Sequence, residues 1–235
     1  MNKKIELISD YYSLIATSIV LIVTSYLDIK NREVDLKVWV ILSPFIIVYY
    51  ILFYQDINLI LLSINVGLVL AILSPLYFLG MLGGADLILG LFMSLLNPTL
   101  ISLNGEVFLP TLFSLLYGSI SMLFLYVFNL VSNKGKKGSL AVKVIARKMK
   151  IRDFLNSRFY FPLEIIERDG TRKFRKTFMV EEDDKEWRDK YQELVKEGVI
   201  SEEEEIWVTW GIPMIPFFFL GYILTIIIGI PFIKH

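Results

Sequence analysis

The sequence predicts a polytopic α-helical membrane protein with six transmembrane helices and a small cytoplasmic α+β domain between the fifth and sixth helices. Its mean hydropathy is +0.59, and 55% of its 235 residues are hydrophobic, compared with roughly 45–50% in ordinary globular domains. The charges are also segregated, because 18 of the 24 basic and 16 of the 24 acidic residues lie between positions 133 and 206. The rest of the chain is therefore apolar enough to occupy a bilayer.

A helix needs about 20 apolar residues to cross the hydrocarbon core of a membrane. Six stretches reach or approach this length: 12–27, 36–54, 57–79, 86–101, 107–131 and 212–233. The fourth is short if it starts at Asp86, which suggests a helix that begins below the membrane surface. The predicted division is residues 1–131 with helices one to five, residues 132–211 as the cytoplasmic α+β domain, and residues 212–235 with the sixth helix.

The cytoplasmic segment has patterns of its own. Asp169-Gly170 is a strong short-range signal for a hairpin turn between two strands, and Gly198 ends a helical pattern. The predicted elements are, in order, a basic helix over 141–150, strands over 159–167 and 172–178, a helix over 183–197 and a strand over 205–210.

Lysine and arginine residues in short loops indicate the orientation, because cytoplasmic loops carry an excess of them. The loop after the first helix contains Lys30, Arg32 and Lys37, and the segment after the fifth begins with three lysines within four residues. The loops after the second and fourth helices contain none. We therefore expect a multi-pass protein of the cell membrane with its N-terminus outside, and with Asp28 and Asp86 on the cytoplasmic side.

The composition excludes several kinds of chemistry. There is no cysteine, which excludes disulfides, thiolate metal sites and cysteine nucleophiles. The single histidine is His235, which excludes histidine-dependent catalysis or zinc binding in the interior. No metal or organic cofactor is implied, and a net charge of zero gives no reason to expect a nucleic-acid partner.

Asp86 opens the fourth apolar stretch and follows Gly83, Gly84 and Ala85. One interpretation is a helix cap, since aspartate accepts backbone N–H groups and complements the helix dipole. A cap does not explain the three small residues, which allow another backbone or a substrate strand to come close. Asp28 ends the first helix beside basic residues, and its simplest interpretation is a solvated carboxylate at the membrane boundary.

Two carboxylates at the same depth on neighbouring helices predict aspartyl chemistry. When they are close together they cannot both ionise, so the pair shares a proton and titrates as a unit. The charged member activates a water and the neutral member donates a hydrogen bond to the scissile carbonyl. Asp28 and Asp86 are therefore the candidate catalytic dyad, and Gly83, Gly84 and Ala85 are the supporting motif.

The string Gly83-Gly84-Ala85-Asp86 resembles the GxGD signature of intramembrane aspartyl proteases. Alanine stands where the consensus has its second glycine, and it is small enough to preserve the close approach. The two residues after the aspartate also differ from the Val-Lys common in bacterial relatives.

Asp28, followed by Arg32 and Val34, resembles the D-x-x-x-R-x-[IV] half of the type IV prepilin peptidase pattern. The size, six predicted spans and external N-terminus are most similar to archaeal preflagellin and prepilin peptidases. The resemblance covers most of the membrane part. The four-cysteine loop and the N-methyltransferase-like region of many bacterial enzymes are absent, so the resemblance implies peptidase activity without N-methylation.

The resemblance also implies a substrate, a preflagellin (archaellin) or pilin-like precursor. Its short basic leader would be cleaved off just before a hydrophobic helix, at the cytoplasmic membrane face. A basic leader should prefer an acidic surface, although acidic runs more commonly solvate helices and loops. The candidate leader-binding residues are Glu181, Glu182, Asp183 and Asp184, and Glu202, Glu203, Glu204 and Glu205.

Three alternatives remain open. A cation-coupled transporter or channel could use Asp28 and Asp86 to bind its ion, although the sequence has neither repeat symmetry nor a polar stripe along its spans. A signal-peptide-peptidase or presenilin-like protease also has a GxGD signature with a catalytic aspartate, but the sequence contains no Pro-Ala-Leu signature. In an assembly scaffold both aspartates would be incidental.

Overall fold

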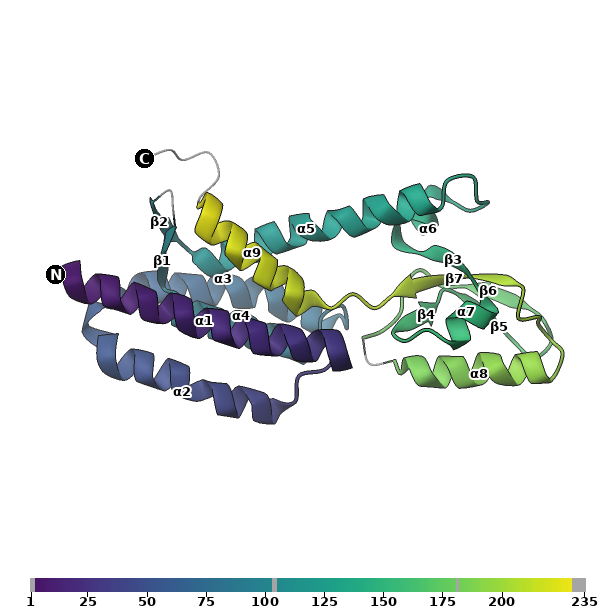
Figure 1. The fold of residues 1–235 in the computed structure, drawn as a ribbon, viewed down its shortest axis with the longest axis horizontal. Helices are drawn as coiled ribbons and strands as arrows, with labels where there is room; N and C mark the ends of the chain where they lie inside the picture. The colour runs from purple at the N-terminus through teal and green to yellow at the C-terminus, as the bar shows by residue number, and fades with distance from the viewer. Residues whose placement is uncertain (1–2, 103–104, 181, 230–235) are drawn as a thin grey trace. The chain divides into compact units, whose positions relative to one another are not determined.

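A computed structural model describes residues 3–102, 105–180 and 182–229 (Figure 1). The chain divides into two compact units. Unit 1 comprises residues 1–122 and 213–235, and unit 2 comprises residues 123–212. The boundary falls inside helix α5 (Pro110–Ser132), which therefore contributes to both units.

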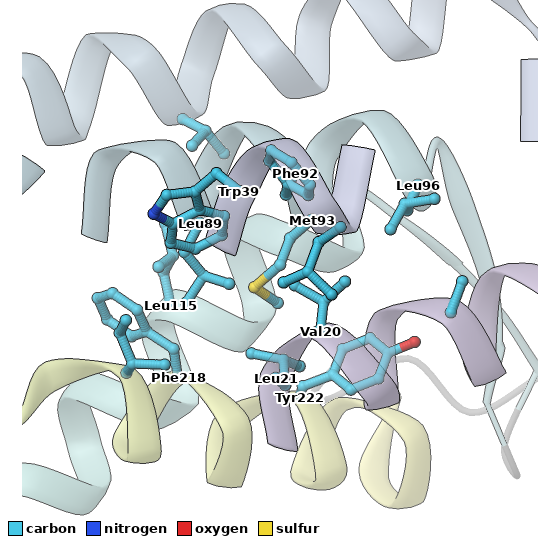
Figure 2. Close-up of a cluster of buried hydrophobic side chains, with 14 of the residues drawn as sticks. Val20, Leu21, Trp39, Leu89, Phe92, Met93, Leu96, Leu115, Phe218 and Tyr222 are labelled. Carbon is cyan, nitrogen blue, oxygen red and sulfur yellow. The ribbon is translucent and has the colours of Figure 1, made fainter. Parts of the chain in front are cut away.

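Unit 1 is built from apolar helices. Besides the first part of α5, its elements are α1 (Lys3–Asn31), α2 (Leu36–Phe53), the 3-10 turn η1 (Tyr54–Asp56), α3 (Leu59–Phe78), α4 (Gly84–Leu96), β1 (Thr99–Ser102), β2 (Gly105–Phe108) and α9 (Met214–Ile228). Helix α1 packs against α2, α4 and α9, and α4 also packs against α3. Figure 2 shows buried side chains of α1, α2, α4, α5 and α9 meeting in one cluster.

Four helical segments are long and apolar enough to cross a membrane: Leu7–Asn31 within α1, and the whole of α2, α3 and α5. Large apolar side chains on their outer faces are exposed, such as Phe78 at 83% and Ile51 at 75%, a surface suited to lipid and not to water. The chain is therefore a membrane protein. Helices α4 and α9 are apolar but shorter, so the count of six spans stays a prediction.

The predicted fourth stretch ends earlier than expected. Helix α4 stops at Leu96, and the chain then forms an antiparallel hairpin of β1 and β2. Proline cannot donate a backbone hydrogen bond and disfavours helical geometry in the residue before it. Pro98 thus explains why Asn97 leaves the helix, with φ −126° and ψ 73°.

Side-chain caps mark the starts of several helices. The Asp35 carboxylate accepts the Lys37 N–H before α2, and Asn58 accepts two N–H groups at the start of α3. Such caps satisfy backbone donors that have no partner within the helix.

Unit 2 is an α+β unit around an antiparallel sheet of order β3-β7-β4 and a separate β5-β6 hairpin. Besides the end of α5, its elements are α6 (Leu140–Ile145), β3 (Arg147–Lys150), α7 (Ile151–Leu155), β4 (Tyr160–Pro162), β5 (Glu164–Ile166), β6 (Arg172–Phe174), α8 (Asp184–Lys196) and β7 (Glu205–Trp210). The predicted hairpin around Asp169-Gly170, the α8 helix and the strand β7 are confirmed.

The prediction of one basic helix over residues 141–150 is wrong. Helix α6 ends at Ile145, Ala146 is extended, and the next four residues form β3, which pairs with β7. Pairing with β7 buries Met149 in the core of unit 2, and this tertiary gain outweighs the local helical preference of the basic segment.

Candidate active site

Asp28 lies in the last turn of α1, where its side chain is only 9% exposed. Its Oδ2 accepts a hydrogen bond of 3.0 Å from the backbone N–H of Ile215, the second residue of α9. Pro213 precedes α9 and supplies no side-chain cap. Because unpaired N–H groups make a helix N-terminus electropositive, the Asp28 carboxylate both caps α9 and gains a favourable field.

Asp86 is the third residue of α4 and is 8% exposed. Its Oδ2 accepts the backbone N–H of Gly83 at 3.1 Å. Asp86 is therefore not the N-cap residue, which is Gly83, but it accepts the N–H of that residue from within the first turn of α4. This contact orients the side chain at the electropositive end of α4.

The fold places the two predicted aspartates on helices that pack against each other, α1 and α4. The Asp28 and Asp86 carboxylates interact electrostatically. Arg32, one turn after Asp28, also interacts electrostatically with it. A pair of nearby carboxylates in an apolar surrounding is an arrangement that can hold a proton and pass it to a bound water or substrate.

The backbone conformation does not require the glycines before Asp86. Gly83 has φ −75° and ψ 154°, which any residue adopts. A Cβ at Gly84 would lie 3.7 Å from a ring carbon of Tyr77, an ordinary van der Waals contact. Gly84 is exposed, so an alanine would fit at this position among the described residues.

The acidic runs lie in unit 2, apart from Glu181, which lies outside the described residues. Most of the other carboxylates form ion pairs within the unit. The pairs are Glu182 with Arg175, Asp184 with Arg188, Glu203 with Lys150 and Arg152, Glu204 with Arg172, and Glu205 with Lys148. These acidic residues therefore have basic partners within unit 2 itself, and their binding of a basic leader stays a prediction.

Glu182 is the most connected of these acids. Partial burial by itself would raise its pKa. Hydrogen bonds from Arg175, the Met179 N–H and the Trp187 indole outweigh burial and hold the pKa below its usual value. For Glu203, the hydrogen bond from Lys150 lowers the pKa.

Two contributors to the site region were not predicted. The Ile215 N–H is a backbone group that every non-proline residue carries, so no sequence signal could have identified it. Asn97 does carry a signal, a lone amide near the end of the fourth apolar stretch.

In the part of the chain that the structure describes, no group of three or more His, Cys, Asp or Glu side chains could hold a metal ion.

Comparison with known proteins addresses the C-terminal part of the chain. No curated protein matches the chain. Residues 138–230 match the family model described as Archaeal Peptidase A24 C-terminus Type II. The match covers most of unit 2 and α9, including the Ile215 that contacts Asp28. This part of the chain is therefore similar to the C-terminal part of archaeal A24 peptidases.

Proposed function

We propose that this protein is an intramembrane-type aspartic endopeptidase with Asp28 and Asp86 as its catalytic dyad. The observation that carries the proposal is the burial of two carboxylates on separate apolar helices, α1 and α4, that pack against each other. The peptidase family match of residues 138–230 supports the reaction class. The proposed substrate is a preflagellin or pilin-like precursor, which loses its short basic leader at the cytoplasmic membrane face.

The dyad would act as general acid and general base. One carboxylate takes a proton from water as its oxygen attacks the scissile carbonyl carbon, and the other carboxyl donates a hydrogen bond to the carbonyl oxygen. The tetrahedral intermediate then collapses, the C–N bond breaks, and the departing nitrogen takes a proton from the dyad. The products are a free leader carboxylate and a new amino terminus, with no N-methylation.

The packing beside Asp86 supports this reaction. Backbone conformation does not demand glycine at position 83, and neither conformation nor packing among the described residues demands it at position 84. Small residues that the fold does not require leave room for an extended substrate strand next to the reacting carboxylate. The basic loop after α1 supports a cytoplasmic position for this face.

The test uses membranes containing the wild-type chain, Asp28→Asn or Asp86→Asn, incubated with a tagged preflagellin whose leader is followed by gel. Each single substitution should lower the cleavage rate by at least about a thousandfold. The two aspartates act together, so the loss of one removes the catalytic contribution of both. The proposal is wrong if either variant cleaves at the wild-type rate.

Addition of a chelator separates the proposal from metal-dependent hydrolysis. Carboxylates activate the water in the proposed reaction, so cleavage by the wild-type chain should not change. Lost cleavage that returns when a divalent metal is restored would instead indicate a metal-dependent mechanism.

A further inference from the structure

Asn97 is a buried polar hub inside unit 1. It is 1% exposed, yet both ends of its amide have partners. Its Nδ2 donates to the Thr17 hydroxyl at 2.7 Å and to the Met93 carbonyl at 2.9 Å. Its Oδ1 accepts from Ser13 at 2.8 Å and from the Tyr222 hydroxyl at 3.1 Å. A fully satisfied amide in an apolar surrounding resists displacement, because any shift leaves polar groups unpaired.

The hub connects four helices. Ser13 and Thr17 belong to α1, Tyr222 belongs to α9, and Asn97 is the C-terminal cap of α4. Asn65 of α3 donates to the backbone carbonyl of Asn97 at 3.0 Å. Tyr222 also packs in the apolar cluster of Figure 2, beside side chains of α1 and α4. The hub therefore fixes the C-terminal end of α4 to α1, which carries Asp28, and to α9, whose N-terminus Asp28 caps.

The spacing relates this hub to the dyad. Thr17 precedes Asp28 by eleven residues on α1, and Asp86 precedes Asn97 by eleven residues on α4. Eleven residues are close to three helical turns, so each hub residue lies on the same face of its helix as the aspartate, about 16 Å away along the axis. The two helices run in opposite directions, since Thr17 is hydrogen-bonded to Asn97 and Asp28 is close enough to Asp86 for their charges to interact. Because Asp28 and Asp86 each lie eleven residues from the Thr17–Asn97 bond, on antiparallel helices, both carboxylates reach the same level along the helix axes.

We propose that Asn97, through its hydrogen bond to Thr17, is a positioning residue that sets the axial register of α1 and α4 and thereby the separation of Asp28 and Asp86. This inference rests on the proposed function for its catalytic consequence. The register itself can be measured without activity. Loss of the bond lets α4 slide or rotate against α1, and a misplacement of about 1 Å in a catalytic group costs about a hundredfold in rate.

The structural test uses the absence of cysteine from the chain. A chain with Asp28→Cys and Asp86→Cys carries two thiols, at the dyad positions. Bifunctional thiol reagents of increasing length report the separation of these thiols through cross-linked peptides in mass spectrometry. The length of the shortest reagent that links the two thiols is measured in this chain and in four versions of it that each carry one further substitution. These substitutions are Asn97→Ala, Thr17→Val, Thr17→Ser and Ser114→Ala.

Thr17→Val and Thr17→Ser form a matched pair, because valine keeps the branched shape and serine keeps the hydroxyl. Ser114→Ala is the control for loss of a buried interhelical hydrogen bond elsewhere, since Ser114 pairs with Thr225 at 3.2 Å between α5 and α9. We expect Thr17→Val and Asn97→Ala to change the preferred reagent length. Thr17→Ser and Ser114→Ala should keep the wild-type length.

The kinetic test uses the same substitutions with both aspartates intact. We expect kcat for leader cleavage to fall about tenfold or more in Thr17→Val and Asn97→Ala while KM stays within about twofold. Thr17→Ser should recover kcat to within about twofold. If Asn97→Ala does not fold, the comparison of Thr17→Val with Thr17→Ser decides alone, because the two variants differ in the hydroxyl that bonds to Asn97 and Tyr222.

Unchanged cross-linking in Thr17→Val, or changed cross-linking with wild-type kcat, overturns the positioning role. Failure of the proposed function has a different signature, which is wild-type cleavage by Asp28→Asn or Asp86→Asn. The cross-linking pattern still measures the register in that case.

Discussion

The Asp28 carboxylate accepts a hydrogen bond from the Ile215 N–H, 187 residues further along the chain. This bond joins the end of α1 to the start of α9. Ile215 belongs to the segment that matches the archaeal A24 peptidase family model, whereas Asp28 lies outside it. The contact therefore gives the C-terminal segment a direct part in orienting one of the two proposed catalytic carboxylates.

A comparison of Asp28→Asn with Asp28→Ala separates the structural role of this residue from its proposed catalytic role. The amide oxygen introduced by Asp28→Asn still accepts the Ile215 N–H, so thermal stability in detergent should stay near that of the wild type. Alanine leaves this buried N–H without its acceptor, at a cost of about 1–3 kcal/mol. Both variants should lose cleavage. Equal melting temperatures for the two variants would show that the bond to Ile215 does not stabilise unit 1.

Gly221 of α9 lies against the backbone of α5. A Cβ at this position would overlap the Ser114 carbonyl oxygen and would lie 2.6 Å from the Gly118 nitrogen. Backbone atoms cannot move aside as side chains do, so Gly221→Ala should force the helices apart and destabilise unit 1 by about 1–3 kcal/mol. Thermal unfolding of the detergent-solubilised chain measures this loss.

Gly67→Ala is the matched control for Gly221→Ala. Gly67 also lies within a helix, and a Cβ there meets nothing within 4 Å. This variant should be at least as stable as the wild type, because alanine has the higher helix propensity. Equal losses in the two variants would contradict the close α5–α9 packing.

Glu182 should make the stability of unit 2 depend on pH. Its folded pKa lies below the ordinary value, owing to Arg175, the Met179 N–H and Trp187. The stabilisation is therefore fully present above the unfolded pKa, roughly 4.3, and is lost as pH falls through the folded pKa. Glu182→Gln should lower stability by about 1–2 kcal/mol at pH 7.

The difference between Glu182→Gln and the wild type should shrink between pH 7 and a pH below the folded pKa, where the glutamate becomes protonated. Thermal unfolding of the full chain at both pH values, followed by circular dichroism, measures it. Glu202→Gln, at an exposed position, is the control and should change stability little at either pH. A Glu182 effect of equal size at both pH values would contradict the ionised network.

Asn133 ties the end of α5 to the start of the unit 2 sheet. It is fully buried and donates to the carbonyls of Lys143, at 3.0 Å, and Ala146, at 2.6 Å. Asn133→Ala leaves these carbonyls without that donor and should destabilise unit 2 by about 1–3 kcal/mol. Hydrogen exchange at α6 and β3 should rise. Asn156→Ala removes a similar bond at an exposed site and should leave this exchange unchanged.

Much of the candidate site was predictable from local sequence. Asp28 and Asp86 stand out as carboxylates at the ends of apolar stretches, and Gly83 and Gly84 mark the second one. The extent of the fourth stretch was not predicted well, because hydrophobicity continues past Asn97 while Pro98 ends the helix. The strand at Arg147–Lys150 was missed for another reason: its partner β7 lies more than fifty residues away.

The sequence by itself determined that this is a membrane protein with a charged α+β segment, because apolar length and charge segregation are local properties of the chain. It also identified the two aspartates and the small residues before one of them. Only the tertiary structure decided that these aspartates interact, that Asp28 caps α9, and that Asn97 anchors α4 to α1. Those contacts join residues from 58 positions apart (Asp28 and Asp86) to 187 positions apart (Asp28 and Ile215), so they exist only once the helices have packed.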